Sequence, residues 1–183
     1  ASSLLWSWIF NYRFGAINQL LASLGIEGPD WIGDERWALI SLSIMSLWGL
    51  GGGIIFYLAG LQTVPRHLHE AAKIAGAGWW RRLFTITLPS MSPILLFSLL
   101  TNIIGGLQTF TSSYLMTSGG PNYSTMFYAL YLYNNAFKYH KMGKACAMAW
   151  ILFIIIMILS ALVMKVSAPM VYYENDGDDG DDE

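Results

Sequence analysis

Charged residues are scarce in this sequence. They make up only 12% of its 183 residues, about half the share found in an average soluble domain, whereas 55% of the residues are hydrophobic. Seven of the twelve carboxylates lie in the last ten residues, so the net charge of −2 describes no folded surface. The composition therefore predicts a membrane protein.

Cysteine is almost absent, and so are the signals of secretion. The single thiol, Cys146, excludes an intramolecular disulfide and is expected to pack as a small hydrophobe. The first segment, Ala1 to Phe10, is too short to span a bilayer and lacks the basic flank of a signal peptide. We expect it to be the end of a longer helix, preceded by a further amino-terminal portion of the protein.

The sequence also lacks the patterns of an enzyme. There is no phosphate-binding loop, because Gly143-Lys144 has neither the upstream glycine nor the following hydroxyl residue of that motif. His67 and His69 are two residues apart on a predicted helix and so diverge, and His140 lies in another loop. We predict no catalytic residues and no metal site.

Long apolar runs are what the sequence has instead. A spanning helix needs about 20 largely apolar residues, and three stretches qualify. In the first two, Ser, Thr, Gly and single amides interrupt the apolar residues, which favours packing against protein or lining a path over exposure to lipid. The three predicted spans are Trp37–Leu61, Ser90–Met116 and Lys144–Val166.

The remaining segments connect these spans. Asn11–Arg36 reads as a surface loop with a short amphipathic piece at Ile17–Leu24, and Tyr123–Tyr139 as an aromatic segment suited to an interface. We expect one membrane domain over residues 1–167 and an acidic, disordered tail over residues 168–183.

The loop 62–89 has the signals of a helix followed by a sharp turn. Thr63 is a candidate cap, and Pro65 suits a first turn. Gly76 and Gly78 permit a change of direction, after which two tryptophans and two arginines suit the membrane interface. The apolar residues of the predicted helix recur at spacings of three and four, as Leu68, Ala71, Ala72 and Ala75. A helix with so narrow an apolar stripe is suited to fit a groove on another protein.

These residues resemble a known family. Glu70-Ala71-Ala72, three residues, Gly76, nine residues, Ile86, one residue and Leu88-Pro89 form the signature loop of the permeases of binding-protein-dependent ABC importers. An isolated Glu-Ala-Ala occurs by chance in many helices. The full spacing between two spanning segments is much more specific.

The resemblance implies an all-α fold, a polytopic membrane helical bundle of the importer permease type, in the bacterial inner membrane. Loop 62–89 would be the coupling loop, whose helix docks into a cleft on the ATPase. Glu70 would supply a charged contact beside Lys73, Ala71 and Ala72 a close-packing surface, and Gly76 the turn. Many members have Asp before this glycine, where Ala75 stands here, so one polar contact is missing.

The implied partners are a dimer of ATPase subunits, which hold ATP and Mg²⁺, a second permease subunit, an extracytoplasmic substrate-binding protein and membrane lipid. Neither a cofactor in this subunit nor nucleic acid is implied. Looser similarities point to the maltose and glycerol-phosphate branch and so to a carbohydrate. They are Leu58–Gln62 before Pro65, the Thr117–Pro121 turn, Tyr131–Tyr133 leading to Ala136-Phe137, and Met142-Gly143.

A polar route at mid-membrane depth is expected in a permease. In the second span, polar and small residues share one helical face, and in the first span an aromatic ring adjoins a glycine run. The candidate path residues are Trp48, Gly49, Gly52, Asn102, Gly106, Gln108 and Thr109. The same residue types also mediate ordinary helix packing, so that alternative stays open.

Two other functions remain to be weighed. The first is a permease for another small solute, such as an amino acid, a polyamine or phosphate. The second, from a different class, is a membrane-embedded enzyme or an autonomous channel. An enzyme would need a convergent acid, base or metal group, which the sequence does not offer. A channel would conduct without a partner.

Overall fold

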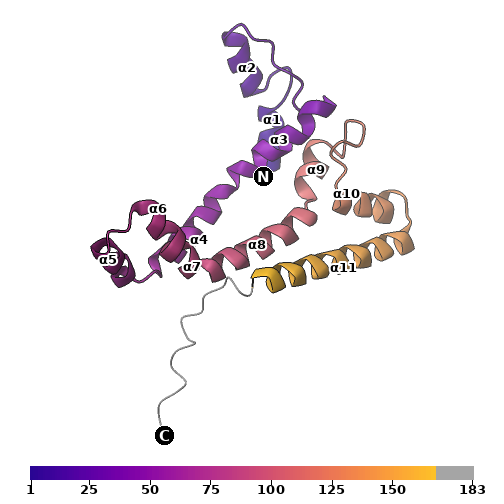
Figure 1. Cartoon of the computed structure of the whole chain (residues 1–183). Helices are drawn as coiled ribbons and strands as arrows, with labels where there is room; N and C mark the ends of the chain where they lie inside the picture. Colours follow the sequence, from indigo (N-terminus) through magenta and orange to yellow (C-terminus); the bar gives the residue numbers. More distant parts are fainter. Residues whose placement is uncertain (168–183) are drawn as a thin grey trace. The chain divides into compact units, whose positions relative to one another are not determined.

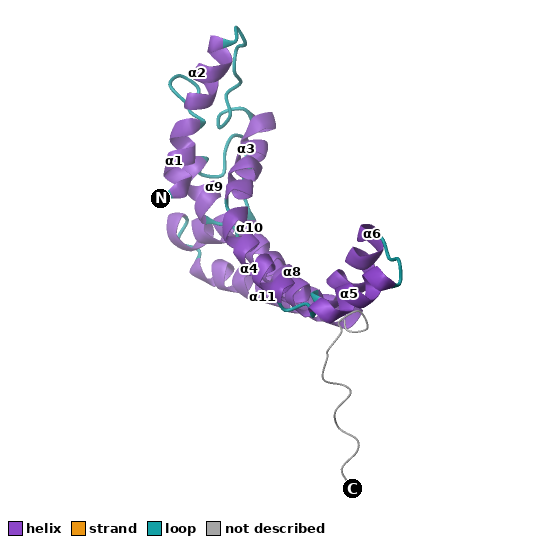
Figure 2. Ribbon diagram, turned by 90° about the vertical axis from the view of Figure 1, so that its left-hand side faces the viewer, coloured by secondary structure: helices purple, strands orange, loops and turns teal. Residues whose placement is uncertain are grey.

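The computed structural model describes residues 1–167, and every regular element in that range is a helix (Figures 1 and 2). The predicted acidic tail, residues 168–183, lies outside the described residues. The chain divides into two compact units. One comprises Ala1–Leu50 and Gly105–Ile154, and the other comprises Gly51–Ile104 and the chain from Ile155.

The first unit is built around a small aromatic core. Phe10, Leu42 and Met116 are buried in it, and Trp6 and Trp31 pack against them. Its helices are α1 (Ser2–Ile9), α2 (Ala16–Ser23), α3 (Glu35–Trp48), α9 (Thr111–Met116), α10 (Tyr128–Tyr133), the π-helix Asn134–Lys138, and the first half of α11 (Met142–Ser167). The predicted amphipathic piece at 17–24 is confirmed as α2.

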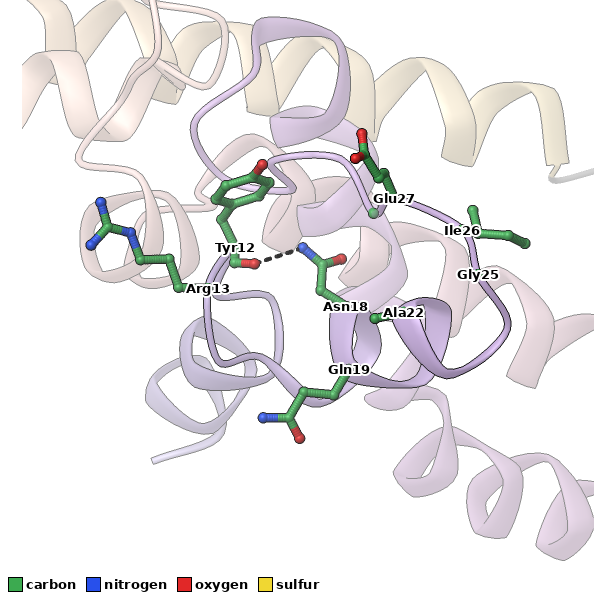
Figure 3. Close-up of a pocket in the computed structure, with 9 residues that line it drawn as sticks. Tyr12, Arg13, Asn18, Gln19, Ala22, Gly25, Ile26 and Glu27 are labelled. Carbon is green, nitrogen blue, oxygen red and sulfur yellow. Dashed lines mark hydrogen bonds between the residues drawn. The ribbon is translucent and has the colours of Figure 1, made fainter.

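Asn18 organises the connection between α1 and α3. Its side-chain amide donates to the carbonyl oxygens of Tyr12 and Pro29 at 3.0 and 3.2 Å, and its own oxygen accepts from the Trp31 indole at 2.6 Å. Figure 3 shows the first of these bonds beside a polar pocket of about 390 Å³. Because all these groups are satisfied by one another, the buried amide is explained by local structure.

The turn after α9 is fixed by buried hydroxyl groups. Thr125 donates to the carbonyl of Gly120 at 2.7 Å, and its hydroxyl lies 2.6 Å from that of Thr117. Ser113 donates to the backbone carbonyl of Thr125. These bonds satisfy the backbone of a turn that contains three non-glycine residues with positive φ, Ser118, Asn122 and Tyr123.

The second unit is a pair of helices joined by the coupling loop. It contains α4 (Leu50–Gln62), α5 (Arg66–Ile74), α6 (Trp79–Arg82), the π-helix Leu83–Thr87, α7 (Leu88–Ser90) and most of α8 (Ser92–Leu107). The helices α4 and α8 approach closely at Gly60, where an added Cβ would lie 2.7 Å from Ile94 Cδ1 and 3.3 Å from the Met91 side chain. Gly60 thus allows the two helices to pack closely, and a larger residue would have to displace the Ile94 and Met91 side chains.

Among residues 1–167, two helical stretches are long and apolar enough to cross a membrane. They are Ser92–Met116, which comprises α8 and α9, and Met142–Ser167, which is α11. They match the second and third predicted spans. The first predicted span corresponds to α3 and α4, which together qualify only as one broken span. The prediction of a continuous helix there is wrong. The chain leaves the helical pattern at Gly49, beside a run of glycines that has low helix propensity.

Candidate functional site: the coupling loop

The coupling loop begins with a tight turn after α4. Val64 is buried, and Pro65 takes the N-cap position of α5 in an extended conformation. The predicted capping role of Thr63 is wrong, because its hydroxyl donates to the carbonyl of Gly60 at 2.8 Å and so closes the end of α4 instead. Pro65 accordingly precedes α5 rather than lying in its first turn.

The helix α5 projects from the unit with no buried residue. Glu70, Ala71 and Lys73 are exposed, and Ala72 is partly buried. Ile74 is 90% exposed, the highest value among the large hydrophobic residues of the structure. Sequence reasoning missed Ile74, although it lies three residues after Ala71 and four after Glu70, on the same side of the helix.

The end of α5 is a rigid turn centred on Gly76. The Gly76 amide donates to the carbonyl of Lys73 at 3.0 Å, and the Ala77 amide donates to that of Ala72 at 2.9 Å. With Gly76 at φ +76°, this is a Schellman motif, which satisfies the last carbonyls of a helix and reverses the chain. The predicted turn at Gly76 is confirmed. Ala75 forms the C-cap, where the family often has Asp.

From Gly78 the chain runs helically into the next span. The signature residues Ile86, Leu88 and Pro89 lie in this run, which passes through the π-helix and α7. Pro89 offers no amide proton, and π-turns occur where the regular hydrogen-bond ladder is disturbed. Regular bonding resumes directly afterwards, as the Met91 amide donates to the carbonyl of Thr87 at 3.0 Å.

The charges of the coupling loop are not neutralised within the part of the chain that the structure describes. Arg66, Glu70, Lys73, Arg81 and Arg82 form no ion pair there. An unpaired carboxylate on a protruding helix is available to a partner. The arrangement is that of an exposed, charged helix closed by a left-handed turn at Gly76.

The candidate path residues are found in both units. In the first, Trp48 is 74% exposed and meets Trp6 edge-on at 6.0 Å between ring centroids, and Thr109 donates to the carbonyl of Gly105 at 3.3 Å. Gln108 is exposed, and Gly49 ends α3. In the second, Asn102 is exposed and donates to the carbonyl of Ser98 at 2.8 Å.

The glycines of the predicted path differ from Gly60. A Cβ added at Gly52 or Gly106 would meet nothing within 4 Å among the described residues. Helix packing within this chain therefore does not require a glycine at either position. They leave open surface for a solute or for another subunit.

A polar link between α4 and α8 was not predicted. The hydroxyls of Tyr57 and Ser98 are hydrogen-bonded to each other, and Asn102 donates to the same Ser98 hydroxyl at 3.2 Å. No sequence pattern joins residues 41 positions apart, and only the packing of α4 on α8 reveals the pair.

Removal of the Tyr57 hydroxyl should weaken this link. We expect Tyr57→Phe to lower stability by about 0.6 kcal/mol, the average for hydrogen bonds between membrane helices. Thermal unfolding of the purified protein measures the effect. Tyr123→Phe is the matched control, because Tyr123 is 74% exposed and should show no shift. An equal shift in both variants would contradict the assignment.

Lys144 stands where the resembled family often has an aromatic residue. Its ammonium donates to the Tyr131 hydroxyl at 3.0 Å and lies 5.1 Å from the centre of that ring. This hydrogen bond, more than the accompanying charge attraction, lowers the pKa of Tyr131. The substitution thus joins the start of α11 to α10.

Within residues 1–167, no three His, Cys, Asp or Glu side chains are grouped so that they could hold a metal ion.

Comparison with known proteins identifies the family of this chain. A family described as "Binding-protein-dependent transport system inner membrane component" matches residues 3–171.

Individual relatives are similar over most of the chain. It is 37% identical over 166 residues to the sulfoquinovosyl glycerol transport system permease protein of Agrobacterium fabrum, covering 90% of this chain and 54% of the relative. It is 38% identical over 178 residues to the probable ABC transporter permease protein YesP of Bacillus subtilis, covering 96% and 57%. The chain thus spans little more than half the length of these relatives.

The fold is similar to a solved structure as well. A chain of a bacterial ABC transporter involved in the import of alginate matches with a TM-score of 0.82 at 19% identity. The match covers 94% of this chain and 62% of that one. At this identity it shows the fold alone, an arrangement of membrane-spanning helices.

Proposed function

The chain belongs to the binding-protein-dependent transport system inner membrane components, and we propose that it forms part of the translocation path of an ATP-driven carbohydrate importer. As a permease subunit it is not an enzyme and carries no cofactor. ATP and Mg²⁺ belong to the separate ATPase. The proposed surroundings are a pair of ATPase subunits, a second permease subunit, a substrate-binding protein and membrane lipid.

The observation that carries the coupling role is the protruding helix α5 with its fixed exit. None of the nine residues of α5 is buried by packing within this chain, so contact with another protein would supply the packing that the helix lacks. Its apolar contribution is Ile74 with the small surface of Ala71 and Ala72, and its charged contribution is Glu70 with Lys73. We assign this surface, together with the Gly76 turn, to docking in a cleft of the ATPase.

Ile74 is proposed as the apolar anchor of that contact. At 90% exposure its side chain is almost wholly in solvent in the isolated chain. Burial of an isoleucine side chain contributes roughly 1.5–3 kcal/mol, more than a solvent-exposed ion pair. In this proposal burial of Ile74 supplies most of the affinity, and the charged contact of Glu70 sets the orientation of the helix.

The proposed cargo is a carbohydrate. The support is twofold. A relative is named for sulfoquinovosyl glycerol transport, and polar groups lie beside open glycines among the path candidates. The amide oxygen of Asn102 has no hydrogen-bond partner among the described residues, so it is free to accept from a sugar hydroxyl. Trp48 offers an exposed ring on which the apolar face of a sugar packs.

Reconstitution tests the proposal. The complete importer, with its binding protein and ATPase in vesicles, should take up a labelled sugar only when ATP is present. This subunit alone should give no flux, and flux without partners would instead identify an autonomous channel. A binding protein that holds an amino acid, a polyamine or phosphate would retain the permease function and replace the cargo.

A further inference from the structure

The segment 79–84 carries an aromatic surface that docking of α5 does not use. The side chains of Trp79, Trp80 and Phe84 are 60%, 66% and 61% exposed. The two indoles meet edge-on at 4.5 Å between centroids, and Trp80 is stacked on Phe84 at 6.2 Å. Three large rings thus form one continuous exposed patch, an arrangement that marks an interaction surface.

Two arginines lie within this patch and lack anionic partners. Arg81 is exposed, and Arg82 is partly buried, with its Nε atom buried and without a hydrogen-bond partner. Neither pairs with a carboxylate among residues 1–167. Four Lys and Arg residues and a single carboxylate, Glu70, occupy residues 62–90. The segment therefore presents a net positive charge next to apolar rings.

The position of the patch relative to the membrane follows from its distance along the chain to the spanning helix that begins at Ser92. Arg82 lies ten residues before Ser92, where the spanning helix begins. At 1.5 Å per residue the separation is at most about 15 Å, which brings the arginines within reach of the headgroup layer. Tryptophan is enriched at that depth because its ring is apolar at one end and polar at the other.

We propose that the patch 79–84 binds an anionic phospholipid, with the guanidinium groups of Arg81 and Arg82 donating to the headgroup phosphate. Arginine suits this role because its planar fork of donors matches phosphate oxygens. The rings of Trp79, Trp80 and Phe84 lie against the upper part of the acyl chains. The lipid holds the end of the coupling loop at the membrane surface while α5 projects to its partner.

The test is lipid retention by the complete importer, purified from a membrane that contains phosphatidylglycerol and phosphatidylcholine. Mass spectrometry of the bound lipids measures the ratio of the two. We expect the doubly substituted Arg81→Gln, Arg82→Gln variant to lower this ratio by at least about tenfold. The charge-matched control Lys138→Gln, Lys141→Gln, in the segment that precedes α11, should leave it unchanged. Added inorganic phosphate should not displace the lipid.

Several results would overturn the proposal. An unchanged lipid ratio in the arginine variant is the first, and displacement by free phosphate is the second. A third is loss of ATPase binding by that variant in vesicles of phosphatidylcholine alone, since the arginines would then contact the protein partner. Lipid retention is measured without transport, so failure of this inference is distinguishable from failure of the proposed function. Only an effect of the bound lipid on uptake would rest on the proposed function.

Discussion

Replacing Gly76 by valine is expected to abolish ATP-driven uptake and to leave membrane insertion intact. Gly76 has φ +76°, a conformation that costs an L-residue about 1–2 kcal/mol and a β-branched residue more. Valine would break the Schellman turn, and α5 would lose its fixed direction relative to α6. We expect uptake by the reconstituted importer to fall by about tenfold or more.

The chain offers a matched control two residues away. Gly78 has φ −64° in an extended conformation, and an added Cβ there would meet nothing within 4 Å. Gly78→Val should therefore keep most of the uptake, and Gly76→Asn should be intermediate, because asparagine tolerates the left-handed region. Equal losses in the two valine variants would show that bulk, rather than backbone conformation, disturbs the loop.

Reversing the charge of Glu70 should uncouple ATP hydrolysis from uptake. Glu70 is exposed and unpaired among the described residues, so its substitution by lysine does not disturb the fold of this chain. The proposed docking would cover this carboxylate in the assembled importer, and loss of a buried charge contact costs on the order of 2 kcal/mol or more, about thirtyfold in binding. We expect uptake to fall by at least that factor.

Parallel assays of ATP hydrolysis and uptake measure this effect. Glu27→Lys, at an exposed position of the first unit, introduces the same charge change and should have no effect on either activity. A bulky residue at Ala72 should reproduce the defect by preventing close approach. Normal uptake by Glu70→Lys would remove the coupling role from α5.

Much of the coupling loop was predictable because its signals are local. Gly76 requires a left-handed conformation, Pro65 excludes a helix before it, and the spacing to Pro89 is a fixed pattern. The error at Thr63 arose because Pro65, two residues later, takes the N-cap position of α5, and the Thr63 hydroxyl donates to the end of α4 instead of accepting from α5. Ile74 was overlooked because it lies off the alanine stripe, and only its exposure in the structure shows that no neighbour within the described chain covers it.

Two of the three spans were predicted in approximate extent, but the break within the first was not. Hydropathy averages over many residues and is insensitive to a single break, such as that at Gly49 or the π-turn before Pro89. The Tyr57–Ser98 bond depends on the rotation of α4 against α8, which apolar periodicity does not fix.

The contact at Gly60 has a mechanical meaning. The helices that enter and leave the coupling loop are clamped together at Gly60 against Ile94 and Met91, and again by the Tyr57–Ser98 bond. Separation of α4 from α8 would require the loss of both contacts. If α5 docks on the ATPase as proposed, its movement is therefore expected to displace α4 and α8 together rather than to spread them apart.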